Sequence, residues 1–244
     1  YCMNSPVNAI DIDGRLTIFI NGFKPSERIV FLGLQSNYNP SPYSELRIPI
    51  TYGRFVNDNF KTKDEYGWGG LDEFYKKRYN DPHALYVNGS DEIGSAASTR
   101  YASGMSKAKE LIEKIRSGEF VLTEGEKIRL VGYSMGAAYA AGMASVLADS
   151  PYGSMLEFVD YIAPHQPTGF EHPADILGRQ YGSKKDILSG KGEKIKNIDD
   201  INHHLGNFGS FGRDFEGHAL GNNFSLNQFI MEVINNGGTV TVYN

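Results

Sequence analysis

The sequence is most informative at Lys127-Ile-Arg-Leu-Val-Gly-Tyr-Ser-Met-Gly-Ala-Ala-Tyr-Ala-Ala-Gly-Met-Ala-Ser-Val-Leu-Ala148. Its first five residues, up to Val131, predict a buried strand because apolar side chains dominate them. Small and apolar residues from Met135 onward predict a helix that packs closely on a sheet. Between the two stands the pentapeptide Gly132-Tyr-Ser-Met-Gly136, which is a G-x-S-x-G motif.

The two glycines of this motif allow a strand-to-helix turn in which other side chains would collide, and the turn lifts the hydroxyl of Ser134 into the open. The helix begins at that point, where its dipole and its first N–H groups favour negative charge. Ser134 is therefore a candidate nucleophile. The alternative is a glycine-serine turn that fits the pattern by chance, and the flanking strand and helix argue against it.

The pattern on either side of the motif predicts alternating strands and helices. Short β-branched and aromatic runs predict a strand followed by a turn within 17–23 and further strands at 84–88 and 156–163. Apolar residues at three- and four-residue spacing predict a helix at 95–117, and weaker patterns predict a last helix at 226–234 and an edge strand at 239–243. Residues 33–83 are rich in Asn, Pro, Tyr and Gly, which predicts an irregular insertion. Strands joined by helices call for a mainly parallel sheet covered on both faces.

The run Val131-Gly-Tyr-Ser-Met-Gly-Ala-Ala138 resembles the nucleophile elbow of the α/β-hydrolase superfamily. The resemblance implies an α/β-hydrolase fold for residues 15–244, with a mostly parallel central sheet, helices on both faces and an irregular insertion. Serine is a weak nucleophile at neutral pH and needs a histidine, oriented by a carboxylate, to take its proton. In this superfamily these partners follow in the order Ser, Asp/Glu, His.

The segment Phe170-Glu-His-Pro-Ala-Asp-Ile-Leu-Gly-Arg179 is similar to the segment that carries the catalytic aspartate in fungal-type triacylglycerol lipases. That family shows His-x-x-Asp-Ile, then an apolar residue and, two further on, an arginine. The resemblance implies that Asp175 is the triad acid, with His172 and Arg179 as the motif histidine and arginine. Two alternatives stay open: Asp175 as a helix N-cap or turn residue, and Asp160 as the acid.

The candidate base is His218, in the glycine-flanked loop Glu216-Gly-His-Ala-Leu-Gly221 just before the predicted last helix. The superfamily presents its late histidine at such a position. His203 and His204 are the alternative, although adjacent histidines in a polar loop are more often surface residues. His165 and His172 are the other histidines after Ser134.

An oxyanion hole needs two backbone donors, and the expected ones are the N–H groups of Met135 and Phe23. Asn21-Gly22-Phe23 resembles the His-Gly-x turn of lipases, with Asn in place of His; the alternative is an ordinary strand-ending turn. Residues 36–83 carry many aromatic side chains, which favour either a lid or acyl-binding wall or a loop that packs on the sheet. Tyr133 and Trp68 are the expected substrate-binding residues.

Residues 1–14, Tyr1-Cys-Met-Asn-Ser-Pro-Val-Asn-Ala-Ile-Asp-Ile-Asp-Gly14, look like the end of an RHS-repeat-associated core. Four residues match the family's pattern: Asn4, Pro6, Asp11 and Gly14. Ser5 stands for an Asn and Ile12 for a Pro. The resemblance implies a junction to a C-terminal effector, residues 15–244, that a bacterium delivers outside the producing cell and that an immunity protein would neutralise. The alternative is a secreted protein whose N-terminus matches by chance.

The bulk composition excludes some partners. The formal net charge of the 244 residues is −5 and no long Lys/Arg run is present, so nucleic acid is not expected as a partner. Cys2 is the only cysteine, so neither an internal disulfide nor a cysteine metal site can form. Residues 1–13 lack the pattern of a signal peptide, so any export depends on something outside this sequence. A basic cluster interleaves with acids at helical spacing and predicts a solvated helix face: Lys107, Lys109, Glu110, Glu113, Lys114 and Arg116.

These residues together predict acyl transfer on an ester, without a metal or organic cofactor. Acyl lipids, as in a lipase, phospholipase or esterase, are the first expected substrates, and a membrane surface is an expected partner. A peptidase or thioesterase on the same fold is a second hypothesis. A hydrolase-shaped binding module without turnover is a third.

Overall fold

The computed structural model describes residues 15–22, 68, 71–81, 84–89, 96–122, 125–182, 193–198 and 200–202. Within them, six strands form one sheet in the order β2-β1-β3-β4-β5-β6. Every neighbouring pair in the sheet is parallel. The strands have these bounds: β1 Arg15–Ile20, β2 Leu85–Val87, β3 Lys127–Tyr133, β4 Leu156–Ile162, β5 Leu177–Tyr181 and β6 Asp200–Asn202.

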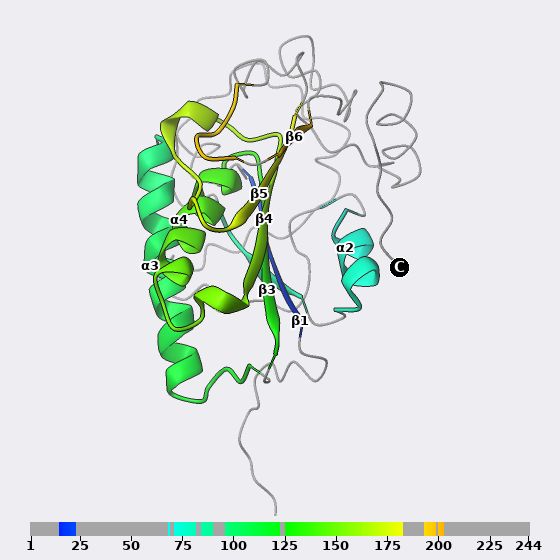
Figure 1. Cartoon of the computed structure of the whole chain (residues 1–244), viewed down its shortest axis with the longest axis vertical. Coiled ribbons are helices and arrows are strands. Elements are labelled where there is room, and N and C mark those ends of the chain that lie inside the picture. Colours follow the sequence, from blue (N-terminus) through cyan, green and yellow to red (C-terminus); the bar gives the residue numbers. More distant parts are fainter. Residues whose placement is uncertain are drawn as a thin grey trace, which may run out of the picture.

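Helices cover both faces of this sheet, as Figure 1 shows: α3 and α4 lie on one face and α2 on the other. Their bounds are α2 Leu71–Tyr79, α3 Ala97–Arg116 and α4 Gly136–Ala148, with short 3-10 helices η2 Gly153–Met155 and η3 Pro167–Gly169. Parallel strands need crossover connections, which explains the layered arrangement. The predicted fold class is confirmed: the described part of the chain is an α/β-hydrolase fold. None of its helices is long and apolar enough to cross a membrane.

The strand registers bring four strand ends to one side of the sheet, which we call the carboxyl edge. Ile20 of β1 pairs with Gly132 of β3, and Tyr133 of β3 pairs with Ile162 of β4. Ile162 in turn pairs with Tyr181, the last residue of β5. Because ligands of parallel α/β sheets bind at the carboxyl ends of the strands, the carboxyl edge is the expected place for a site.

Two different cores form on the two faces of the sheet. The face under α3 and α4 is mainly aliphatic and alanine-rich, with Ile18, Leu130 and Met143 all fully buried. The face under α2 is aromatic, where Phe19 stacks on Tyr86 with 5.3 Å between ring centroids. Burial of apolar area at about 25 cal/mol per Å² makes both cores the main source of stability.

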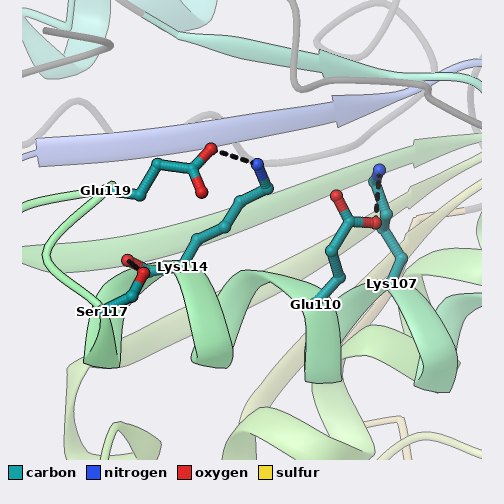
Figure 2. Close-up of polar contacts among 5 residues, drawn as sticks. All are labelled: Lys107, Glu110, Lys114, Ser117 and Glu119. Carbon is teal, nitrogen blue, oxygen red and sulfur yellow. Dashed lines mark hydrogen bonds and ion pairs between the residues drawn. The ribbon is translucent and has the colours of Figure 1, made fainter. Parts of the chain in front are cut away.

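Helix α3 carries the basic and acidic cluster predicted from the sequence. Lys107 and Glu110 form an ion pair with 2.9 Å between Nζ and Oε2, and Lys114 pairs with Glu119 one turn further on (Figure 2). The side-chain hydroxyl of Ser117 donates to the carbonyl oxygen of Lys114 near the end of the helix. Lys107 departs from the solvated pattern, since it is only 8% exposed. The pair of Arg116 and Glu113 on the same helix is exposed, and exposed pairs contribute about 0–1 kcal/mol each.

Some local predictions differ from the structure. The insertion predicted to be irregular contains the helix α2, because Leu71, Tyr75 and Tyr79 share one face that packs toward the aromatic core. Strands β5 and β6 were not predicted. Polar residues occupy β5, and their partners are distant in sequence: the Gln180 side chain bonds to the carbonyl of Glu193 at 2.6 Å. The first strand ends at Ile20, just before the predicted turn that begins at Asn21. Residues 1–14, 226–234 and 239–243 lie outside the described residues.

Candidate active site

Ser134 occupies a strained turn between β3 and α4, at the carboxyl edge. It is only 6% exposed, so the prediction that its hydroxyl stands in the open is wrong in this structure. The φ of Ser134 is 53°, in the left-handed region that residues other than glycine rarely adopt. Three backbone hydrogen bonds hold this conformation. The N–H of Ser134 donates to Ile162 at 2.9 Å, and its carbonyl accepts from Ala137 and from His165, each at 3.1 Å. Strain of this kind persists only where the surroundings fix it, and it concentrates at active sites.

The glycines of the motif permit close approach of backbones. A β-carbon at Gly132 would lie 2.7 Å from the carbonyl oxygen of Gly136, and one at Gly136 would overlap the carbonyl oxygen of Ile20. The start of α4 therefore packs directly on the end of β1. Met135 is the N-cap residue of α4, so its N–H stands where the helix offers donors to an anion.

The loop after β1 contacts the serine through bare backbone. A β-carbon built on Gly22 would lie 2.6 Å from Cβ of Ser134 and 3.2 Å from its Oγ. Asn21 precedes this glycine, is 5% exposed, and donates from Nδ2 to the Gly22 carbonyl at 2.8 Å. Phe23, the predicted second oxyanion donor, lies outside the described residues.

Two of the candidate histidines after Ser134 are described by the structure. His165 follows β4 at the carboxyl edge, where its amide binds Ser134, and its side chain is half-buried. His172 is 1% exposed: its Nε2 lies 2.6 Å from the carbonyl of Ile176, and its Nδ1 lies 2.8 Å from the hydroxyl of Tyr161. A carbonyl only accepts, so Nε2 carries the proton and Nδ1 accepts from tyrosine. His172 is thus a structural residue.

The proposed base and its alternative lie elsewhere in the chain. His218, His203 and His204 are outside the described residues.

The structure does not bring Asp175 and Ser134 together. Asp175 is exposed, in a turn two residues before β5 begins at Leu177. Leu177 pairs with Phe158, which pairs with Arg129, five residues before Ser134 along a parallel strand. At about 3.3 Å per residue this separates the two by roughly 17 Å along the sheet. Asp175 lies at the opposite edge of the sheet. This position agrees with the alternative interpretation of Asp175 as a turn residue.

Asp160, the other acid considered, is enclosed in the middle of β4. It accepts from Nε and Nη2 of Arg179 at 2.6 and 2.9 Å and from the hydroxyl of Tyr75 at 2.5 Å. Burial raises the pKa of the Asp160 carboxyl, and the guanidinium opposes this shift. Burial lowers the pKa of Arg179, but Asp160 outweighs this effect and raises it above its usual range. The motif arginine thus joins β4 to β5 instead of serving a catalytic aspartate.

Tyr133 and Trp68 lie side by side, with 6.2 Å between ring centroids. Tyr133 immediately precedes Ser134 at the carboxyl edge and is half-buried. Trp68 is only 2% exposed and packs on Phe19 at 5.1 Å. The buried Trp68 ring therefore packs against the Tyr133 ring. The aromatic residues of the insertion that the structure describes, among them Trp68 and Tyr75, pack on the sheet.

Sequence reasoning missed the polar side chains that fix the loops around Ser134. The Asn21 amide is one, and Arg100 in the first turn of α3 is another, since it is 3% exposed and donates to the Gly89 carbonyl. Their signal was weak because each binds backbone, which no residue pattern reveals. In the described residues, no group of three or more His, Cys, Asp or Glu side chains is placed to hold a metal ion.

Comparison with known proteins gives similarity only at the level of structure. The chain matches no protein-family model and no curated protein sequence. It is similar to a lipase-esterase related protein from Clostridium acetobutylicum, with 12% identity and a TM-score of 0.38 over 80% of this chain and 87% of that one. A cutinase-like protein from Cryptococcus sp. has 11% identity and a TM-score of 0.38 over 96% and 100%. RedJ has 12% identity and a TM-score of 0.40 over 94% and 93%. With TM-scores this low, the fold assignment rests on the chain's own sheet order and on the turn at Ser134.

Proposed function

We propose that this chain is a serine hydrolase that cleaves esters through an acyl-enzyme formed on Ser134. The observation that carries the proposal is the convergence of three backbone features on one residue. Ser134 has a left-handed φ, it stands at the start of α4, and the backbone of Gly22 lies against its side chain. Holding a serine in such a conformation costs on the order of 1–3 kcal/mol, which favours a functional reason for it.

In the proposed reaction, Oγ of Ser134 attacks an ester carbonyl while a histidine takes the hydroxyl proton. The carbonyl oxygen becomes an oxyanion, which the N–H groups of Met135 and Phe23 stabilise. The histidine then passes its proton to the departing alcohol, and water attacks the acyl-enzyme to release the acid and restore Ser134. His218 is the proposed base. These steps transfer an acyl group and protons without any change of oxidation state, so the proposal includes no metal or organic cofactor.

The acid that orients the histidine must come from the carboxyl edge, because Ser134 lies there. The strand after β4 that ends at this edge is β5, whose last residue is Tyr181. The first acidic residue after Tyr181 in the sequence is Asp186, which lies outside the described residues. We propose Asp186 as the acid in place of Asp175, in keeping with the order Ser, Asp, His.

Acyl lipids are the proposed substrates. The resemblance of the segment around Ser134 to lipases supports this class. The half-buried ring of Tyr133 adds an apolar surface next to the nucleophile. We propose that Tyr133 contacts the acyl chain and that Trp68 holds its ring in place.

The place of action follows from the resemblance of residues 1–14 to the end of an RHS-repeat-associated core. We propose that residues 15–244 are an effector domain that a bacterium delivers outside the producing cell, where it meets membrane lipids. An immunity protein is then the proposed partner in the producer. Expression directed to the bacterial periplasm should reduce growth in a manner that depends on Ser134, and unaffected growth would contradict the effector proposal.

The reaction itself is tested by hydrolysis of p-nitrophenyl esters and phospholipid vesicles and by labelling with a fluorophosphonate probe. Ser134→Ala should abolish both turnover and labelling. Ser145→Ala is the matched control, since Ser145 lies on α4 and its hydroxyl only bonds to the Gly142 carbonyl. Activity that survives Ser134→Ala would overturn the proposal. If peptides or thioesters were hydrolysed faster than esters, the proposed substrate class would be wrong, but Ser134 would remain the proposed nucleophile.

A further inference from the structure

Asn21 lies at the centre of a hydrogen-bond network that ends beside the nucleophile. Its N–H donates to the carbonyl of Val87 at 3.2 Å, and its Oδ1 accepts from the N–H of Gly89 at 3.0 Å. Its Nδ2 donates to the Gly22 carbonyl at 2.8 Å. The side chain is 5% exposed, so these bonds are shielded from water. Asn21 thus ties the end of β2 to the loop that follows β1.

Arg100 extends this network to helix α3. Its Nη1 donates to the carbonyl of Gly89, whose N–H binds Asn21. Arg100 is 3% exposed and stands in the first turn of the helix. The start of α3 is anchored in turn, since the N–H of Ala97 donates to Oε1 of Gln166 at 2.9 Å. A buried guanidinium on a fixed helix is a rigid donor for the Gly89 carbonyl.

The network fixes the orientation of one peptide group. The carbonyl of Gly22 and the N–H of the following residue belong to the same planar trans peptide, in which they point in opposite directions. Holding the carbonyl therefore sets the direction of that N–H. This is the N–H of Phe23, which the proposed function uses as an oxyanion donor. Gly22 itself is packed against Ser134, so a small rotation of this peptide would change the geometry at the reacting atoms.

We infer that Asn21 and Arg100 are positioning residues that hold the peptide after Gly22 in the orientation needed to bind the oxyanion. The inference rests on the proposed function, because an oxyanion forms only if Ser134 attacks a carbonyl. Neither residue touches the substrate. Asn21 acts through the Gly22 carbonyl, and Arg100 acts through Gly89 and Asn21.

The sharpest test is Asn21→Asp, because aspartate keeps the size of the side chain and the acceptor for Gly89 but cannot donate to Gly22 when ionised. We expect kcat on a p-nitrophenyl ester to fall about 10- to 100-fold with little change in KM, since the loss concerns the transition state. Arg100→Met should lower kcat in the same direction, and Arg100→Lys should restore part of it because lysine still donates. The matched controls are Asn80→Asp, in an exposed turn, and Arg116→Met, at the exposed end of α3; both should leave kcat unchanged.

A second readout separates positioning from a purely structural role. A trifluoromethyl ketone forms a tetrahedral adduct with an active serine, so its affinity should fall in parallel with kcat/KM across these variants. The affinity of the carboxylic acid product, which forms no oxyanion, should stay constant. If Asn21→Asp unfolds, Arg100→Lys and Arg100→Met provide the same comparison.

The outcomes distinguish this inference from the proposed function. Unchanged kcat and ketone affinity in folded Asn21→Asp and Arg100→Met would overturn the inference while the fluorophosphonate labelling of Ser134 still stands. Equal losses for the ketone and the product would also overturn it. Absence of labelling in the unaltered chain would instead remove the proposed function, and the inference with it.

Discussion

Gly22 and Ser134 are in contact across the carboxyl edge: a β-carbon on Gly22 would stand 2.6 Å from Cβ of the serine. Real β-carbons do not approach other atoms so closely, so Gly22→Ala must displace either the loop after β1 or the turn at Ser134. We expect this variant to lose about 100-fold or more in kcat/KM, because a shift of about 1 Å at reacting groups has effects of that size. Steady-state kinetics with p-nitrophenyl esters checks this. Thermal unfolding should show that the variant is still folded, and activity near that of the unaltered chain would contradict the contact.

The two aspartates proposed as acid give opposite predictions. Asp175→Asn should leave kcat/KM within about twofold, because Asp175 is exposed at the far edge of the sheet. Asp186→Asn should lower kcat/KM by about 10⁴-fold if it orients the base, as the loss of a triad carboxylate does in other serine hydrolases. Parallel kinetics on the two folded variants decides between them. A large loss in Asp175→Asn alone would favour the motif resemblance over the topology.

The comparison of these two residues shows what the sequence could and could not predict. The turn at Ser134 was predictable because its signals are local: two glycines, a β-branched strand before it and an alanine-rich helix after it. The segment Phe170–Arg179 also matched the lipase motif in the identity of its residues. Its residues serve distant partners, however, since His172 binds Tyr161 and Arg179 binds Asp160. A sequence motif does not reveal at which edge of the sheet its residues will lie.

The missed elements have a similar cause. Helix α2 carries its aromatic side chains for packing on the sheet, and such residues also fit an irregular loop. Strand β5 was missed because Arg179 and Gln180 are polar, and their burial is compensated only by Asp160 and by the backbone near Ile195. Tertiary pairing outweighs intrinsic strand propensity in β5.

The ion pair of Asp160 and Arg179 should make Asp160→Asn strongly destabilising. The substitution leaves a largely enclosed guanidinium without its counter-charge, and breaking a buried pair in this way costs about 3–5 kcal/mol. Denaturant unfolding measures the effect. Glu171→Gln is the control, since the pair of Glu171 and Lys196 is exposed and its loss should cost no more than about 1 kcal/mol. Equal stability of the two variants would show that Asp160 and Arg179 are not held together in solution.

The buried tyrosines predict a loss of stability at high pH. Burial, followed by the charge of Asp160, raises the pKa of Tyr75 well above its ordinary value of 10.0. Burial and the nearby Tyr101 likewise raise the pKa of Tyr161. The unfolded chain therefore releases these protons at lower pH than the folded one, so the stability they provide is complete below pH about 10 and is lost as pH rises beyond it. Tyrosinate absorbance should appear together with the loss of circular dichroism, and Tyr75→Phe should lower stability at neutral pH but flatten its alkaline decline. Ionisation of Tyr75 and Tyr161 in the folded protein near pH 10, the ordinary pKa of tyrosine, would contradict the burial of these two side chains.

Helices α3 and α4 approach each other closely at a glycine of each helix, Gly104 and Gly142. A single added methyl group at this contact should therefore lower the stability strongly. A β-carbon at Gly142 of α4 would overlap the carbonyl oxygen of Tyr101 on α3. Gly142→Ala therefore has to separate the helices, and overpacking of this kind costs about 1–3 kcal/mol despite the better helix propensity of alanine. Gly182→Ala is the matched control, since a β-carbon there meets no atom of the described residues within 4 Å. Thermal unfolding should place the Gly142 variant clearly below the control. Because α4 begins at the nucleophile, its displacement should also lower the rate of fluorophosphonate labelling of Ser134, whereas a stable and fully reactive Gly142→Ala protein would show that the helices do not approach so closely.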